Sequence, residues 1–137
     1  MNRLEAGRDY PISIIVADLD GLKKINDSMG HAMGDELLKT CAEILCRSLR
    51  QSDILARVGG DEFTVLLPNT DIAVSREITE RIRARIKEHN ESDPRLSLSL
   101  SIGVATAERK DGSLENTYST ADNRMYQDKI SRRQSKE

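Results

Sequence analysis

The stretch RVGGDEFTVLLP, from Arg57 to Pro68, places two glycines directly before two acids, with apolar residues on both sides. A Gly-Gly pair favours a tight hairpin turn and lets another backbone or a ligand come close. The flanking segments DILARV and EFTVLLP are short and β-prone. The pattern therefore predicts a β-hairpin with Asp61 and Glu62 projecting from its tip. The alternative is an ordinary hairpin whose acidic turn is solvated.

Working outward from the hairpin, apolar periodicity predicts two further strands and three helices. ISIIVADLD contains a short, β-branched apolar run, Ile12 to Ala17, and predicts a buried strand that ends near Asp18. RLSLSLSIGVAT alternates apolar residues with serine and predicts a strand with one lightly packed face. Helical spacing predicts helices over residues 34–49, 71–89 and 114–129. This order of elements indicates an α/β (α+β) sandwich with a largely antiparallel sheet flanked by helices.

Length and composition narrow the class of protein. The 137 residues suit one domain that is long enough to bury a core. Apolar residues make up 37% and charged residues 32%, which is typical of a folded, soluble domain. The formal net charge is −2 with acids and bases well mixed, so the chain lacks the basic footprint of a nucleic-acid binder. An anionic ligand would therefore need a local cluster of positive charge or a metal.

The chain shows no signal for a membrane or an oxidising compartment. No apolar run reaches the length of a transmembrane helix, and the N-terminus MNRLEAGRDYP has no hydrophobic segment. Cys41 and Cys46 do not share a helix face, which favours unpaired thiols over zinc or a disulfide. We expect a cytoplasmic domain without membrane contact, although the parent protein can be membrane-anchored. Residues 1–137 are interpreted as one module of a longer protein, with a frayed tail at 131–137.

The acids at the end of the first predicted strand raise the possibility of a metal site. Asp18 and Asp20 stand two apart, so in a continuing strand both point to one face of the sheet. A lone Asp-x-Asp more often has one acid capping a turn and the other in solvent. If the hairpin lies beside this strand, however, Asp61 faces Asp18. That pair suits a hard cation with oxygen ligands, Mg²⁺ above all, which usually shares its site with substrate phosphates.

These segments together resemble the GGDEF family, the diguanylate cyclases. RVGGDEF is similar to the family's signature hairpin, and DLDGLKKINDSMGHAMGDELL to its metal- and guanine-binding segment. LSLSIGVA is similar to its later core strand, and ADNRMYQDK to its C-terminal helix. The resemblance implies a fold like that of nucleotidyl cyclases and polymerase palm domains. It also implies synthesis of cyclic di-GMP and two pyrophosphates from two GTP, with one GTP held by each subunit of a transient homodimer.

The resemblance assigns catalytic and substrate-binding roles to particular positions. Asp18 and Asp61 would bind Mg²⁺, or Mn²⁺ as a substitute, with help from the main-chain carbonyl of Leu19, and Glu62 would lie at the same catalytic site. Guanine would be read by a carboxylate and an amide, whose alternative role is to cap the loop and helix that follow. The implied guanine residues are Asn26 and Asp35, and the implied phosphate contacts are Lys23, Lys129, Arg133, Gly59 and Gly60.

A second ligand site is implied just before the hairpin. RQSD, from Arg50 to Asp53, resembles the family's inhibitory product site, and Arg81 falls where the family often has a second arginine for that site. Arginine can stack on guanine and pair with its edge or with phosphate, so product binding is favoured here. The alternative is a surface ion pair between Arg50 and Asp53.

Five positions depart from the family pattern. Two look like core variation, and three bear on the phosphate contacts near the C-terminus. The departures are Leu22 and Met29 in place of Phe, Asp128 in place of a small residue, and Arg132 and Gln134 in place of Gly and Asn.

Two functions from different classes fit the sequence. The favoured one is a diguanylate cyclase that is controlled by an N-terminal sensor or dimerisation domain in the parent protein. The alternative is a module that binds GTP or cyclic di-GMP without turnover. Degenerate members usually lose the signature acids, whereas Asp18, Asp61 and Glu62 are all present. A change of base is disfavoured because Asp35 supplies the carboxylate that favours guanine.

Overall fold

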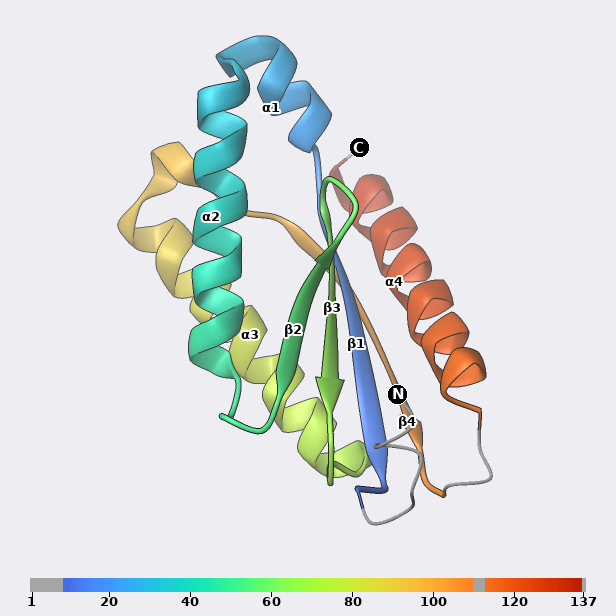
Figure 1. Ribbon diagram of the computed structural model, residues 1–137. Helices are drawn as coiled ribbons and strands as arrows, with labels where there is room; N and C mark the ends of the chain where they lie inside the picture. The colour runs from blue at the N-terminus through green and yellow to red at the C-terminus, as the bar shows by residue number, and fades with distance from the viewer. Residues whose placement is uncertain (1–8, 110–112, 137) are drawn as a thin grey trace.

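The computed structural model describes residues 9–109 and 113–136, which form a four-stranded sheet with helices on both faces (Figure 1). The elements follow in this order: β1 (Ile12–Leu19), α1 (Leu22–Met29), α2 (His31–Ser48), β2 (Ile54–Val58), β3 (Glu62–Leu67), α3 (Ile72–Ser92), the 3₁₀ helix η2 (Pro94–Leu96), β4 (Leu100–Ala107) and α4 (Leu114–Lys136).

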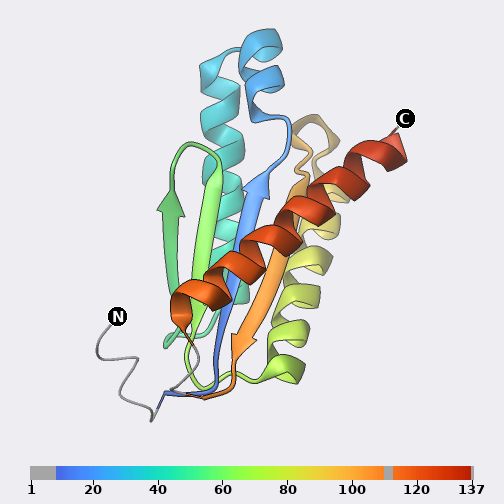
Figure 2. The ribbon, with the colours of Figure 1, turned by 90° about the vertical axis from the view of Figure 1, so that its right-hand side faces the viewer.

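The sheet is antiparallel, which confirms the predicted largely antiparallel arrangement. The structure adds the strand order, which is β2-β3-β1-β4. β1 is central and buried at every position because helices cover both faces of the sheet. Figure 2 shows α2 and α3 behind the strands and α4 crossing in front of them. β2 and β4 are the edge strands.

Alternation along β1 divides the core between the two faces. Ile15, Ala17 and Leu19 pack with buried residues of α2, α3 and β3. Ile14 and Val16 point the other way and pack against α4. Asp18 follows in this second series, so its side chain lies on the α4 face of the sheet.

Close packing of α4 depends on one glycine in β4. A Cβ at Gly103 would lie 2.0 Å from the backbone oxygen of Ala121 and 2.2 Å from the backbone nitrogen of Met125. Backbone therefore meets backbone at this crossing, and there is no space for a side chain. This contact sets the depth at which α4 lies on the sheet.

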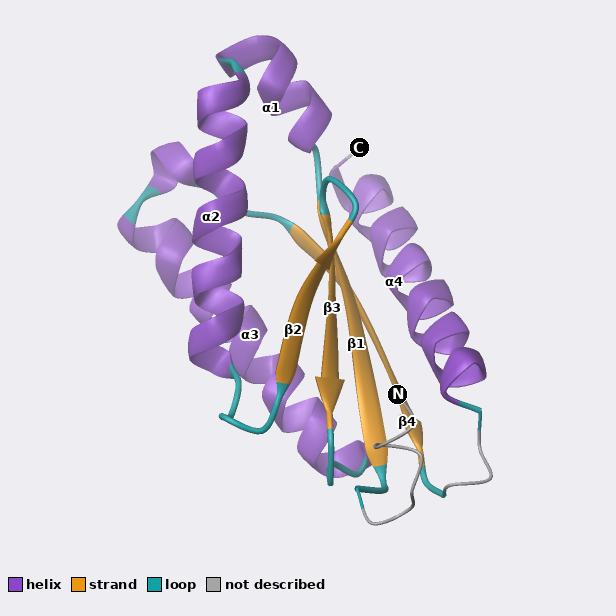
Figure 3. Cartoon of the chain, in the orientation of Figure 1, coloured by secondary structure: helices purple, strands orange, loops and turns teal. Residues whose placement is uncertain are grey.

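The structure contains one helix that was not predicted, and several predicted boundaries differ, such as the start of α2 at His31 instead of residue 34. The unpredicted helix is α1, which has only eight residues between Gly21 and Gly30, so its apolar pattern is too short to indicate a helix. The strand predicted from residue 95 begins at Leu100, because η2 precedes it and the Asn90 amide bonds both the N–H and the C=O of Leu98 (Figure 3). The tail predicted to fray from residue 131 continues α4 as far as Lys136.

The two cysteines lie on α2 as free thiols, with Cys41 buried and Cys46 exposed. Burial raises the pKa of the Cys41 thiol to about 12. Among the described residues, no helix combines the length and the apolar character needed to cross a bilayer.

Candidate functional site

The hairpin of β2 and β3 brings its acidic turn to the end of β1. In the β1–β3 ladder Asp18 pairs with Glu62, and the Leu19 N–H donates to the Asp61 carbonyl at 2.9 Å. The hairpin therefore lies beside the first strand, which meets the condition set by the sequence analysis. Asp61 was expected to face Asp18 in that case, but Glu62 stands directly opposite Asp18 and Asp61 is one residue further on. The carboxylates of Asp18 and Asp61 still interact, because Asp61 raises the pKa of Asp18.

Asp18 is the buried acid of this site, with only 8% of its surface exposed. Its Oδ2 accepts a hydrogen bond from the Lys129 ammonium group, whereas its Oδ1 is buried without a hydrogen-bond partner among the described residues. Burial raises the pKa of Asp18, Asp61 adds to the rise, and Lys129 opposes it. Burial in turn opposes the charge of Lys129, but Asp18, Asp20 and Asp61 raise the pKa of Lys129. A second cation at the free oxygen would relieve the repulsion between the two carboxylates.

The donors present fit a magnesium ion that is bound partly by its substrate. The buried free oxygen of Asp18 and the neighbouring Asp61 carboxylate are hard oxygen ligands. Within the described residues no cluster of three or more His, Cys, Asp or Glu side chains could form a metal cage. Mg²⁺ commonly uses one or two carboxylates and completes its shell with waters and phosphate oxygens. Two carboxylates therefore meet what the protein must supply.

A cavity of about 580 Å³ opens beside this pair. Leu19, Asp61, Lys23 and Lys129 line it, so four positions that the sequence implied for metal or phosphate lie together. Helix α1 supplies the rest of the wall, which consists of Gly21, Leu22, Lys24, Asp27 and Ser28. Lys24 was missed by the sequence reasoning, although it directly follows Lys23. The volume lies in the range of small-molecule sites.

The turn of the hairpin leaves room for a ligand. Gly59 has a φ of +78°, a backbone conformation that favours glycine, and both Gly59 and Gly60 are exposed. A Cβ at either position would meet no atom within 4 Å. The open space is consistent with the contact to substrate that was predicted for these glycines.

The other two acids near the turn are engaged by neighbouring side chains. Asp20 accepts from the hydroxyl of Ser99 at 2.8 Å and from that of Ser101 at 2.7 Å. Glu62 accepts from the phenol of Tyr118 on α4 at 2.8 Å, and this bond raises the pKa of Tyr118. The sequence did not identify these partners. Ser99 just before β4, Ser101 on β4 and Tyr118 on α4 reach the acids only when the sheet and α4 are assembled.

The two residues implied for guanine are Asn26 on α1 and Asp35 on α2. These neighbouring helices lie above the end of β1 (Figure 1). The Oδ1 atom of Asn26 fills the space over Gly34 and is buried without a hydrogen-bond partner among the described residues. Asp35 is exposed and lines a separate pocket of about 340 Å³ with Arg57 and Phe63. Neither side chain caps α2, because its N-cap residue is Gly30 and no side chain caps that end. The capping alternative is therefore not observed.

Arg50 and Asp53 lie near the C-terminal end of α2, far from the hairpin tip (Figure 1). The Arg50 guanidinium pairs with Asp53 at 2.8 Å and also donates to the Pro68 carbonyl and the Thr70 hydroxyl. Arg81 donates separately to the Ser48 carbonyl at 3.0 Å. The ion pair expected as the alternative reading is therefore present, and it also links the end of α2 to the segment after β3.

The three C-terminal residues that depart from the family pattern, Asp128, Arg132 and Gln134, lie on α4. The Asp128 carboxylate accepts from the Ile102 N–H, from Arg83 and from Arg132, and Arg132 thereby has a partner. The side chains of Arg133 and Gln134 lie outside the described residues. The predicted phosphate contact of Arg133 is therefore not placed by the structure.

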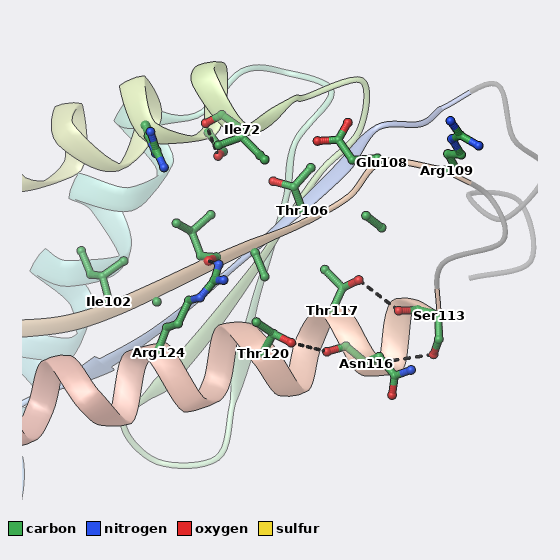
Figure 4. A pocket seen from close by; sticks show the side chains of 16 residues that line it. Ile72, Ile102, Thr106, Glu108, Arg109, Ser113, Asn116, Thr117, Thr120 and Arg124 are labelled. Atoms are coloured by element: carbon green, nitrogen blue, oxygen red, sulfur yellow. Dashed lines mark hydrogen bonds between the residues drawn. The ribbon is translucent and has the colours of Figure 1, made fainter.

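Another cavity lies away from the residues that the sequence implied for the site. It has a volume of about 900 Å³ and lies along the outer edge of β4, between α3 and α4 (Figure 4). None of the residues that the sequence implied for catalysis, substrate or product lines it. Its size therefore does not locate the site.

Comparison with known proteins relates this arrangement to a family. The family model for the diguanylate cyclase GGDEF domain matches residues 1–135. The chain is 35% identical over 123 residues to the probable diguanylate cyclase DgcT of Escherichia coli, covering 87% of this chain and 27% of DgcT. It is 36% identical over 139 residues to the response regulator PleD of Caulobacter vibrioides, covering 97% of this chain and 30% of PleD. The chain thus spans less than a third of either relative.

A solved structure has the same fold. The GGDEF domain of DgcB from Caulobacter crescentus, in complex with c-di-GMP, superposes with a TM-score of 0.77 at 27% identity, covering 88% of this chain and 72% of that chain. The predicted palm-like architecture is thereby confirmed. The family-model match over nearly the whole length, together with the acidic hairpin beside β1, shows that this chain belongs to the GGDEF family.

Proposed function

We propose that this domain is a diguanylate cyclase, which condenses two GTP into cyclic di-GMP and two pyrophosphates. The observation that carries the proposal is one cavity lined by Asp61, Lys23 and Lys129. The buried Asp18, whose Oδ1 has no hydrogen-bond partner among the described residues, contacts two of these lining residues, Asp61 and Lys129. Carboxylates for a metal and cations for phosphates thus lie at or directly beside one cavity. The names of the curated relatives support the same activity.

In this proposal Asp18, Asp61 and the carbonyl of Leu19 hold Mg²⁺, for which Mn²⁺ can substitute. The bound ion would neutralise charge on the triphosphate. Lys23 and Lys129 bind phosphate oxygens, which requires Lys129 to turn from Asp18 toward the nucleotide. Arg133 is proposed as a further phosphate contact. Glu62 belongs to the same site and is oriented by its bond to Tyr118.

The reaction requires two copies of the domain. The 3′-oxygen of one GTP forms a bond to the α-phosphorus of the other, its proton is released and pyrophosphate leaves. A second, equivalent step closes the ring. Because one pocket holds one GTP, two subunits must face each other about a two-fold axis. We therefore propose that this cytoplasmic domain forms a transient homodimer, whose concentration is controlled by an N-terminal sensor or dimerisation domain of the parent protein.

Guanine selectivity is proposed to rest on Asn26 and Asp35. The unpartnered Asn26 oxygen and the exposed Asp35 carboxylate lie on neighbouring helices, where a base could bond with both. A site built to meet hydrogen-bonding groups strongly rejects a ligand that lacks them. GTP should therefore bind far more tightly than ATP in calorimetry, and Asp35→Ala should reduce that difference. Equal affinities for the two nucleotides would refute this assignment.

The catalytic test is incubation with Mg²⁺ and GTP, followed by identification of the nucleotide products. Asp18→Asn and Asp61→Asn preserve shape but remove charge, and each should lower turnover by about a hundredfold or more. Glu80→Gln, which alters an exposed acid on α3, serves as the matched control. GTP binding without cyclic di-GMP formation at any enzyme concentration would support the binding module instead. Near wild-type turnover in Asp61→Asn would refute the metal assignment.

Product inhibition is proposed at Arg50, Asp53 and Arg81. Within the described residues, Arg50 forms its hydrogen bonds through its Nε and Nη2 atoms and its backbone N–H. The Nη1 atom and the flat face of the guanidinium therefore stay available to cyclic di-GMP. Arg81→Ala should weaken product binding and leave GTP binding unchanged. Arg47→Ala, an exposed arginine of α2, is the control. Indistinguishable product titrations for wild type and Arg81→Ala would remove Arg81 from the site.

A further inference from the structure

The C-terminal third of α4 carries Lys129 but has little apolar packing of its own. The last buried side chain of α4 is Met125, and among the described residues beyond it none is buried. In Figure 2 these turns extend past the β4 edge of the sheet. Polar contacts must therefore hold the end of α4 that brings Lys129 to Asp18.

Two side chains of α4 bond to the outer edge of β4. Arg124 donates to the Val104 carbonyl at 2.8 Å, and Asp128 accepts from the Ile102 N–H at 2.9 Å (Figure 4 shows Arg124 and Ile102). These backbone groups point away from β1 and have no neighbouring strand, since β4 is at the edge of the sheet. Arg124 and Asp128 are one helical turn apart, so one face of α4 caps the strand edge.

Asp128 directly precedes Lys129, and its carboxylate joins β4, α3 and α4. The same Oδ2 that accepts from β4 also accepts from Arg83 of α3 at 3.3 Å and from Arg132 of α4 at 3.1 Å. Burial opposes ionisation of Asp128, but these donors together hold the pKa of Asp128 below its usual value. The acceptor is therefore a charged carboxylate, whose hydrogen bonds are stronger than those of a neutral group.

The sheet connects this contact to the catalytic pair. Ile102 pairs with Ala17 in the β1–β4 ladder, one position before Asp18. Asp18 itself pairs with Ser101, so Asp128 fixes α4 to the β4 residue next to the one opposite Asp18. Lys129, the next residue of α4, reaches Asp18 across the same face of the sheet. A small residue at position 128 could not make this contact.

We infer that Asp128 is a positioning residue, which fixes the end of α4 so that the Lys129 ammonium lies over Asp18 and the phosphate pocket. The catalytic meaning of this role rests on the proposed cyclase function. The positioning itself does not, and it can be measured without turnover.

A double-mutant cycle measures the coupling between Asp18 and Lys129. Unfolding equilibria are compared for wild type, Asp18→Asn, Lys129→Met and the double variant, in EDTA so that no metal replaces the lysine. In wild type we expect the double variant's change in the unfolding constant to differ by about fivefold from the product of the two single-variant changes. In the Asp128→Ala background the coupling should fall to about unity, because Lys129 is no longer held in place.

Two further variants keep the experiment decisive. Asp128→Asn keeps an oxygen for the Ile102 N–H and should retain the coupling, even if Asp128→Ala folds poorly. Gln127→Ala, which removes an exposed polar side chain from the adjacent position of α4, should also retain it. Undiminished coupling in Asp128→Ala, failure of Asp128→Asn to retain it, or its loss in Gln127→Ala would each overturn the inference.

Kinetics provide the second readout. If Asp128 acts through Lys129, then Asp128→Ala should lower kcat/KM for GTP, and adding it to Lys129→Met should have no further effect. Additive losses in the double variant would show that Asp128 acts independently of Lys129 and would overturn the inference. If no variant makes cyclic di-GMP while the stability cycle behaves as expected, the proposed activity fails and the positioning role stands.

Discussion

Substitution of Gly103 by alanine tests how closely α4 lies on the sheet. The new Cβ would lie 2.0 Å from the Ala121 oxygen and 2.2 Å from the Met125 nitrogen. Both are backbone atoms, so no side chain can rotate to relieve the overlap. To restore a contact of 3.4 Å, α4 would have to move away by about 1.4 Å, which opens the core between β1 and α4.

Overpacking of this kind commonly costs 1–3 kcal/mol, and an unyielding backbone places Gly103→Ala near the upper end, at about 3 kcal/mol. For a domain of this size the expected fall in Tm is about 10 °C. Urea unfolding followed by circular dichroism gives the free energy directly. The displaced helix also carries Lys129, so the coupling between Lys129 and Asp18 should weaken in the same variant.

Gly60→Ala is the matched control, because a Cβ there meets no atom within 4 Å. Its unfolding free energy should stay within about 0.5 kcal/mol of wild type. If Gly103→Ala lost less than about 1 kcal/mol with an unchanged denaturant slope, α4 could not lie as close to β4 as the structure shows.

Three further outcomes are expected. Only Cys46 should react with a thiol reagent near pH 8 in the folded protein, because burial raises the pKa of Cys41 to about 12; rapid reaction of both thiols would contradict this. The pKa of Asp128 is lowered on folding, so its ionised carboxylate stabilises the folded state. Wild type should therefore exceed Asp128→Asn in free energy of unfolding by the largest amount at neutral pH. This difference should shrink as the pH falls below about 4, and a difference that grows in acid would refute the reasoning. Alkaline titrations of wild type and Tyr118→Phe, followed by ultraviolet absorbance, should differ by one tyrosine that ionises above about pH 10. That tyrosine is Tyr118, whose pKa is raised because its phenol donates to Glu62. Ionisation at or below that pH would count against the hydrogen bond.

Much of the fold could be predicted from local patterns. The β-branched run of β1 indicates a strand that is buried on both faces. The spacing of leucine and isoleucine in α2 and α3 indicates which side of each helix is buried. The Gly-Gly turn indicated a hairpin, and the hairpin lies where its acids meet the end of β1. Helix α1 escaped prediction because its eight residues are fewer than the window over which helical periodicity can be recognised, although Leu22 and Ile25 pack against the core.

The site was predictable in its residues but not in their partners. Asp18, Asp61, Lys23 and Lys129 could be identified from their order along the chain, with the family resemblance supplying their roles. That Lys129 bonds Asp18 and that Tyr118 bonds Glu62 could not, because these contacts join residues 111 and 56 positions apart. Such pairs form only when α4 crosses the sheet at one depth and one angle.

The sequence by itself determined the elements, the acidic hairpin and the residue types available for a metal and for phosphates. The tertiary structure alone decided that Glu62 rather than Asp61 stands opposite Asp18, that Arg50 links the end of α2 to Thr70, and that Asp128 fixes α4 to β4. The physical reason is that an amphipathic pattern specifies which face is buried, whereas strand register and helix crossing follow from close packing between distant segments. In this protein the backbone contact at Gly103 is the clearest instance of such packing.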